Sequence, residues 1–349
     1  MEINYKGKTM NTIAYEPMSD ELFEMLRQQH YAKPSFREVQ QEFGDVACRN
    51  GVNISKIRKY YFMDLMEKAQ VYASKWTPED VWEYKPLLEC FYGKVKRNSK
   101  AFGETAELIE QIEAAIRLGG RGIAGLVSQF PIKSVDLMLN AFDINNNWYD
   151  MSCGWGSRLL GAMRNRVNYF GTDPNYLLVD RLKQMQHDYQ STTHTHTQVD
   201  IRCQGSEVFV PEWENKIGLC FTSPPYFYLE DYKIGKQSYK QGTTYQSWLD
   251  NYLEPTIQNC FKYLINRGVL AINIKNFDKF KLEEDTIKIA EKNGFVFMEN
   301  FELENISRVK ADGTLLDTNE NIICFCKKGF ENEYKPYKKP EQISLFDFI

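Results

Sequence analysis

The sequence predicts an α/β protein whose mostly parallel sheet, with helices on both faces, follows a helical N-terminal module. Two observations carry this prediction. From about residue 119 onward, short apolar runs alternate with amphipathic stretches, which is the pattern of parallel strands joined by helices. Before that point the chain lacks such runs and carries signals for helix starts. We therefore expect a helical module over 1–118, an α/β domain over 119–330, and a linker with a terminal peptide over 331–349.

The helical module is predicted from two capping patterns. Ser35-Phe36-Arg37-Glu38 has the spacing of a capping box, and Thr77-Pro78 places a capping residue before a proline at the first helical position. The run from Gly119 to Gly122 then interrupts the helical pattern. The sequence therefore favours a boundary there.

The sheet is predicted from four apolar runs, with helical segments expected at 158–163 and 245–264. The expected strands are 147–151, 167–173, 217–221 and 268–274. In sheets of this kind, ligands bind beyond the carboxyl ends of the strands. The motifs described below all follow such ends.

The bulk composition is that of a folded protein. The 349 residues are 43% hydrophobic and 14% aromatic, with a net charge of −4, so nucleic acid would have to be bound by local basic patches. Eight cysteines form no disulfide framework, the N-terminus has no apolar signal core, and no window suits a membrane span. We expect a cytoplasmic protein. We expect no metal, because His194 and His196 lack a third ligand and Cys324 and Cys326 alternate along a strand.

A glycine-rich loop follows the first expected strand. Gly154 and Gly156 allow a sharp turn and close approach of a ligand, and Asp173 follows the next strand, where a carboxylate can accept hydrogen bonds from ribose hydroxyls. The third glycine of a dinucleotide fingerprint is missing, since Leu159 stands there, which disfavours a pyrophosphate. S-adenosylmethionine, which has no phosphate, fits this pattern. An ordinary tight turn would also explain the glycines.

The segment from Thr222 to Phe227 reads Thr-Ser-Pro-Pro-Tyr-Phe and ends the third expected strand. Consecutive prolines cannot continue a central strand, but they form a stiff loop with free carbonyls. The Ser223 hydroxyl and the Pro224 carbonyl could accept the two protons of a planar amino group and direct its lone pair at a methyl donor. Tyr226 and Phe227 offer aromatic faces for a flipped base. A rigid Pro-Pro turn with a buried tyrosine is the alternative.

These residues resemble the DNA amino-methyltransferases, whose signature is Asp, Asn or Ser followed by Pro-Pro-Tyr or Pro-Pro-Phe. The resemblance covers about 120–328 and implies a Rossmann-like methyltransferase fold, S-adenosylmethionine as cofactor and DNA as partner. It implies a catalytic set of Ser223, Pro224, Pro225 and Tyr226. It implies a cofactor-binding set of Phe130, Pro131, Asp150, Ser152, Gly154, Gly156, Asp173, Ser206 and Thr222. For Ser206, a solvated loop is the alternative.

The serine of the motif resembles the cytosine-N4 branch more than the adenine-N6 branch, so cytosine N4 is the favoured target. Met151 and Cys153 depart from the residues common in the family's glycine-rich loop. Carbon-5 chemistry is excluded, because Cys220 precedes the loop and points into the sheet by alternation. RNA or protein-amide methylation is an alternative, as is a regulatory DNA-binding protein with a degenerate domain.

Two further segments could hold nucleic acid. The pattern over 37–62 is that of a helix-turn-helix whose second helix would present Lys56 and Arg58 outward. After the Pro-Pro motif, Lys233, Lys236 and Lys240 are interleaved with tyrosines, which suits a backbone groove with base stacking. A helical hairpin with a basic face and a mobile surface loop are the respective alternatives.

The chain ends in a Lys- and Pro-rich linker and a short apolar peptide. Gln342, Leu345 and Phe346 resemble the Gln-x-x-Leu-Phe peptide with which bacterial and phage replication proteins bind a sliding clamp. Packing of the peptide against its own domain is the alternative.

Overall fold

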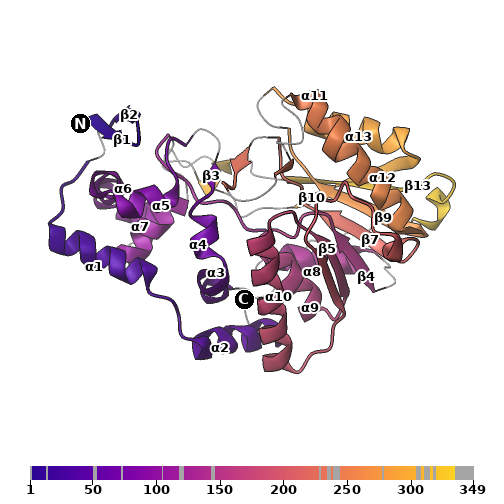
Figure 1. Ribbon diagram of the computed structural model, residues 1–349, viewed down its shortest axis with the longest axis horizontal. Coiled ribbons are helices and arrows are strands. Elements are labelled where there is room, and N and C mark those ends of the chain that lie inside the picture. Colours follow the sequence, from indigo (N-terminus) through magenta and orange to yellow (C-terminus); the bar gives the residue numbers. More distant parts are fainter. Residues whose placement is uncertain are drawn as a thin grey trace. The chain divides into compact units, whose positions relative to one another are not determined.

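A computed structural model of the chain describes most of the sequence (Figure 1). The described residues are 2–12, 15–49, 53–71, 74–103, 105–117, 122–142, 146–227, 229–233, 237–238, 244–276, 279–303, 308–309, 315–316 and 320–334. They form two compact units. The first contains 1–43, 53–129 and 227–237, and the second contains 44–52, 130–226 and 238–349.

The first unit is mainly helical and opens with a two-stranded hairpin that the sequence did not predict. The hairpin strands are β1 (Glu2–Tyr5) and β2 (Lys8–Asn11). The helices are α1 (Asp20–Tyr31), α2 (Phe36–Ala47, of which the last residues count with the second unit), α3 (Ser55–Tyr61), α4 (Met63–Met66), α5 (Pro78–Glu83), α6 (Lys85–Arg97) and α7 (Leu108–Arg117). A short strand, β3 (Gln70–Val71), pairs with β8 (Glu230–Asp231).

Both predicted helix caps are present. The Ser35 hydroxyl accepts from the Glu38 N–H at 3.4 Å while the Glu38 carboxylate accepts from the Ser35 N–H at 2.8 Å. Thr77 and Asp80 make the same reciprocal pair at 3.2 and 3.0 Å. Each pair satisfies backbone donors that the first helical turn leaves without partners.

The boundary between the units lies after Gln129, not at residue 119 as the sequence suggested. The reason is that Ile123 and Ala124 are buried in the core of the first unit, where the Ile123 carbonyl accepts from the Trp76 N–H at 2.9 Å. The segment from 227 to 237 also belongs to the first unit, through the pairing of β8 with β3.

The second unit contains a seven-stranded sheet in the order β10-β13-β9-β7-β4-β5-β6, which confirms the predicted fold class. Its strands are β4 (Asn147–Asp150), β5 (Asn168–Thr172), β6 (Val199–Arg202), β7 (Ile217–Thr222), β9 (Leu264–Asn273), β10 (Phe295–Leu303) and β13 (Glu320–Lys327). The pairs β10–β13 and β13–β9 are antiparallel and the others are parallel. The remaining short strands, β11 (Arg308–Val309) and β12 (Leu315–Leu316), pair with each other.

Helices cover both faces of this sheet (Figure 1). One group is α8 (Ile132–Ala141), α9 (Ser157–Arg164) and α10 (Tyr176–Thr193). The other is α11 (Tyr245–Trp248), a π-helical turn (Leu249–Leu253), α12 (Glu254–Tyr263) and α13 (Leu282–Lys292). In the described part of the chain, no helix is both long and apolar enough to cross a membrane.

The strand order reverses between β4 and β7. From β4 the chain adds β5 and β6 on one side, and from β7 it continues to β9 on the other. A crevice forms at such a switch point, beyond the carboxyl ends of the strands, because the connections leave in opposite directions. Asp150 ends β4 and Thr222 ends β7, so the two motifs predicted from sequence lie at this switch point.

Candidate functional site

Asp150 is the centre of a buried hydrogen-bond network at the switch point. Its carboxylate is fully buried and accepts on one oxygen from the Thr222 hydroxyl (2.8 Å) and the Ser152 N–H (3.3 Å). The other oxygen accepts from Arg158 Nε and from the Tyr169 hydroxyl, both at 2.7 Å. All four partners donate, so the network requires a carboxylate at this position.

The same network joins the glycine-rich loop to the Pro-Pro loop. The Ser152 hydroxyl lies 2.9 Å from the Thr222 hydroxyl and donates to the Ser223 carbonyl at 3.1 Å. Thr222 in turn donates to Asp150. The two loops are therefore held in register by side chains of both, although 70 residues of chain separate Ser152 from Thr222.

Both glycines of the glycine-rich loop adopt backbone conformations that other residues disfavour. Gly154 and Gly156 have φ of 57° and 82°, in the left-handed region that side chains disfavour. A methyl group at Gly154 would also meet the Arg158 guanidinium at 3.3 Å. Gly156 precedes α9, and Leu159, where a dinucleotide fingerprint has its third glycine, is fully buried.

Asp173 lies just past β5 and is 8% exposed. Its carboxylate accepts from the Asn175 N–H at 2.9 Å and from the Gly154 N–H. Burial raises the pKa of Asp173 to about 7, against the stabilising effect of these two backbone donors. Half-protonated near neutral pH, this carboxyl is suited to exchange its proton for hydrogen bonds from a ligand.

Arg158 is a site residue that sequence reasoning missed. Its side chain is 7% exposed, it pairs with Asp150, and it donates to the Ser152 carbonyl. Burial alone would lower the pKa of Arg158, but the Asp150 carboxylate more than offsets it and raises that pKa. The signal was available: a cation in the first turn of a helix opposes the helix dipole and so calls for a nearby carboxylate.

Phe130, which is predicted to bind the cofactor, contacts the same arginine. The Phe130 ring lies 5.8 Å from the Arg158 guanidinium and packs edge-on against Phe221 at 5.5 Å. Pro131 directly precedes α8. Ser206, in contrast, is not in a solvated loop, because it is buried and its hydroxyl lies 2.8 Å from the Thr256 hydroxyl.

The Pro-Pro loop is only partly open to solvent. Ser223, Pro225 and Tyr226 are half-buried and Pro224 is buried. Phe227 is 6% exposed, so its ring does not present the accessible face expected from the sequence. Carbon-5 chemistry is disfavoured by the fully buried Cys220, because burial raises its thiol pKa well above the ordinary value.

The basic residues predicted to bind nucleic acid differ in their partners and in their exposure to solvent. Lys56 forms an ion pair with Glu38 at 3.3 Å and Lys233 one with Asp231 at 2.7 Å, so both cations have partners within their own unit. Arg58 does not point outward as predicted, since it lines a pocket and its Nε is buried. Lys236, Lys240, Gln342, Leu345 and Phe346 lie outside the described residues.

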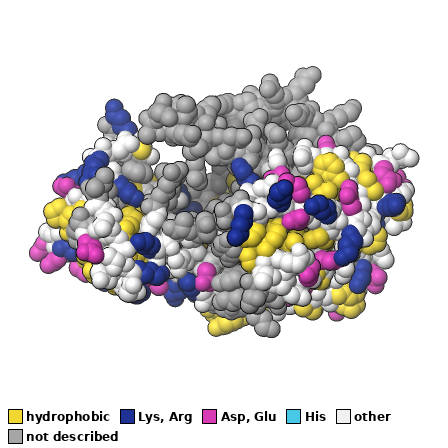
Figure 2. Space-filling model, turned by 90° about the horizontal axis from the view of Figure 1, so that it is seen from above, with side chains coloured by type: hydrophobic (Ala, Val, Ile, Leu, Met, Phe, Trp, Pro, Cys, Tyr) yellow, Lys and Arg dark blue, Asp and Glu magenta, His cyan; other side chains and the backbone are white. Residues whose placement is uncertain are grey.

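The surface charge is mixed in sign, and the described residues form no cluster of metal ligands. On the face in Figure 2, Lys and Arg side chains are interspersed with Asp and Glu. Among the described residues, no group of three or more His, Cys, Asp and Glu side chains could hold a metal ion. His194 caps the end of α10 and His196 lies two residues beyond it, and both are exposed.

Comparison with known proteins found no matching family model and no matching curated protein. Among solved structures, the chain is similar to a TehB-like SAM-dependent methyltransferase from Corynebacterium glutamicum (15% identity, 56% of this chain and 86% of that chain, TM-score 0.35). It is also similar to a SAM-dependent O-methyltransferase from Thermotoga maritima (11% identity, 58% and 67%, TM-score 0.39). A third is an S-adenosylmethionine-dependent methyltransferase from Clostridium acetobutylicum (10% identity, 58% and 94%, TM-score 0.40). Identities this low indicate neither an activity nor a substrate for this chain.

Proposed function

We propose that this chain is an S-adenosylmethionine-dependent methyltransferase that methylates an exocyclic amino group of a DNA base, with cytosine N4 the favoured target. The observation that carries the proposal is the network from Asp150 through Thr222 and Ser152 to the Ser223 carbonyl. This network joins the glycine-rich loop, which would hold the nucleoside of the cofactor, to the Pro-Pro loop, which would position the amine, and ligands of such sheets bind at the switch point.

The donors and acceptors at the switch point fit this cofactor. The buried Asp173 carboxylate suits two ribose hydroxyls, and the left-handed glycines let backbone approach the ligand closely. The buried Leu159 in place of a third glycine speaks against a pyrophosphate. The exposed ring of Tyr176, three residues after Asp173, offers a face on which an adenine could stack.

When bound, S-adenosylmethionine supplies a methyl group on a sulfonium, which becomes a neutral thioether after transfer. The task of the protein is to make an aryl amine nucleophilic. The Ser223 hydroxyl and the Pro224 carbonyl would accept its two protons, which favours a tetrahedral nitrogen with its lone pair directed at the methyl group. One of these protons leaves to solvent once the new C–N bond has formed. Tyr226 would stack on the base.

The decisive test is methyl transfer from tritiated S-adenosylmethionine to unmethylated plasmid DNA, to RNA and to protein, followed by nucleoside analysis. Label in N4-methylcytosine is expected, whereas label in N6-methyladenine would reassign the base. Label in RNA or protein alone would overturn DNA as substrate. Tight DNA binding with no label would support a regulatory protein instead.

A substitution isolates the role of the Pro-Pro loop. Ser223→Ala should lower kcat by roughly 10²-fold, the usual effect of losing one preorganised hydrogen bond in a transition state. Its cofactor affinity should be unchanged. Ser191→Ala, at an exposed position on α10, is the matched control and should behave as the wild type. An unaltered kcat in Ser223→Ala would remove that hydroxyl from the mechanism.

We also propose that the terminal peptide with Gln342, Leu345 and Phe346 binds a DNA sliding clamp, on its resemblance to such peptides alone. Apolar anchors on a flexible tether suit docking into preformed pockets. The test is retention of the full-length chain on an immobilised clamp, against a chain that ends at Pro340. Equal retention would contradict the proposal.

A further inference from the structure

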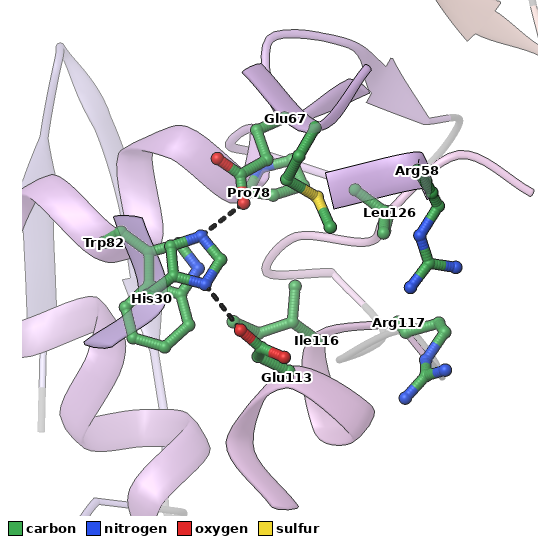
Figure 3. Close-up of a pocket in the computed structure, with 10 residues that line it drawn as sticks. His30, Arg58, Glu67, Pro78, Trp82, Glu113, Ile116, Arg117 and Leu126 are labelled. Carbon is green, nitrogen blue, oxygen red and sulfur yellow. Dashed lines mark hydrogen bonds and ion pairs between the residues drawn. The ribbon is translucent and has the colours of Figure 1, made fainter. Parts of the chain in front are cut away.

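A small pocket in the first unit is lined by two arginines that have no carboxylate of their own (Figure 3). The Arg58 and Arg117 guanidinium groups lie one above the other on the same side of the pocket. Arg58 comes from α3 and Arg117 from the last turn of α7. The other lining residues are His30, Met63, Glu67, Pro78, Trp82, Glu113, Ile116 and Leu126.

The two acidic side chains of the pocket are held by His30 instead. Its Nδ1 lies 2.8 Å from Glu113 and its Nε2 contacts Glu67, while its ring stacks on Trp82 at 3.9 Å. Burial would lower the pKa of His30, but these two carboxylates raise it overall. The two carboxylates thereby favour the protonated form of the ring, and Glu113 also forms an ion pair with Lys59 at 3.7 Å.

Arg58 and Arg117 therefore place two like charges in one pocket, which Glu113 offsets only in part. Burial, and then the charge of Arg117, lower the pKa of Arg58, whereas Glu113 and Glu42 act in the opposite direction. Glu42 is engaged by the N–H groups of Ile57 and Lys56, at 2.7 and 3.3 Å. Within the described part of the chain, no carboxylate lies within 4.0 Å of either guanidinium, and the buried Arg58 Nε has no hydrogen-bond partner.

A buried donor without a partner and two adjacent like charges both cost free energy, and an anion would relieve both costs. Two guanidinium forks suit a tetrahedral oxyanion, since each can donate two parallel hydrogen bonds to it. The pocket has about 30 Å³ of free space, which at roughly 10–15 Å³ for a water-sized group admits two oxygen atoms. It can seat the two non-bridging oxygens of one phosphodiester but not a sugar or a base.

We propose that Arg58 and Arg117 bind one phosphate group, and that in the working enzyme this is a phosphodiester of the DNA backbone. The choice of DNA as the source rests on the proposed function. It is supported by β8, which pairs with β3 of this unit and begins four residues after Tyr226 of the Pro-Pro loop. A phosphate contact positions the duplex without reading its sequence.

The first arm of the test measures the site without DNA or catalysis. Inorganic phosphate should raise the melting temperature of the wild-type chain, and Arg117→Gln and Arg58→Gln should abolish that rise. Arg117 is exposed, so its substitution is expected to leave the fold intact. Arg267→Gln, which removes the same charge at an exposed position in β9, is the matched control and should keep the rise. A rise that survives in both pocket variants would overturn the site.

The second arm measures binding to a duplex at several salt concentrations. Each pocket variant should bind about tenfold more weakly at low salt, with a log–log salt slope shallower by about 0.9, the value for one phosphate. Affinity for S-adenosylmethionine should not change. Phosphate stabilisation with wild-type DNA affinity in the variants would mean that the site takes a free phosphate, which overturns DNA as its source. If the wild-type chain neither binds nor methylates DNA, the proposed function is wrong. The first arm then still shows whether Arg58 and Arg117 bind phosphate.

Discussion

Replacing Asp150 by asparagine should destabilise the second unit strongly, because every neighbour of this carboxylate donates a hydrogen bond. The amide NH₂ of asparagine must face either Arg158 Nε or the Ser152 N–H, and neither can accept. Arg158, with 7% of its side chain exposed, would also lose its counter-charge. Removing one partner of a buried ion pair costs about 3–5 kcal/mol, and we expect that loss in the free energy of unfolding.

The matched control is Asp200→Asn. Asp200 also pairs with an arginine, Arg202, at 2.8 Å, but the two side chains are 29% and 41% exposed. Water screens such a pair, so its loss should cost about 1 kcal/mol or less. Urea unfolding gives the free energies, and hydrogen exchange of the β4 and β5 amides reports on this unit alone. If Asp150→Asn lost no more stability than Asp200→Asn, the reasoning about the buried network would be wrong.

Three further predictions concern the same unit. Because the pKa of Asp173 is raised to about 7 and the ribose-binding form is the carboxylate, cofactor affinity should fall about tenfold from pH 8 to pH 6. Calorimetric titration measures this, and Asp173→Asn should bind weakly with no such dependence; a pH-independent wild type would contradict it. Gly161→Ala should cost about 1–3 kcal/mol in urea unfolding, since the methyl group would meet Val135 at 2.5 Å, while Gly44→Ala, with nothing within 4 Å, should not. Cys220→Ala should keep its methyl-transfer rate in the tritium assay, and a rate near zero would indicate a nucleophilic thiol.

The strands of the sheet could be predicted because each is a local run of apolar residues in the sequence. The four expected strands match β4, β5, β7 and β9 to within four residues at each end, since buried parallel strands are nearly continuous apolar runs. The π-helical turn within the expected helix 245–264 was not predicted, as nothing in its composition distinguishes it from an α-helical turn. The positions of Asp150, Gly154, Gly156 and Thr222 followed from the strands, because each motif directly follows one.

The first unit was less predictable because long-range contacts decide its details. Arg58 looked solvent-facing on a short basic helix, yet it lines a pocket with Glu113 and Arg117, more than 50 residues away. The pairing of Gln70–Val71 with Glu230–Asp231 joins two-residue strands that have no periodicity to detect. No pattern of neighbouring residues in the sequence could have predicted these distant partners.

The pairing of β3 with β8 anchors the chain in the first unit shortly after the Pro-Pro loop. The chain leaves the Pro-Pro loop at Tyr226, enters the first unit at Phe227, and within four residues of Tyr226 is hydrogen-bonded as β8 to β3. Glu230, at the start of β8, is held by the Ser128 N–H and the Tyr232 hydroxyl, so this segment is anchored by side chains as well as by backbone. Only a short connection separates β8 from the Pro-Pro loop, so a ligand that displaced β8 would also displace the loop. Lengthening that connection by two glycines after Phe227 should lower kcat while leaving cofactor affinity unchanged, and an unchanged kcat would show that the loop does not depend on its attachment to the first unit.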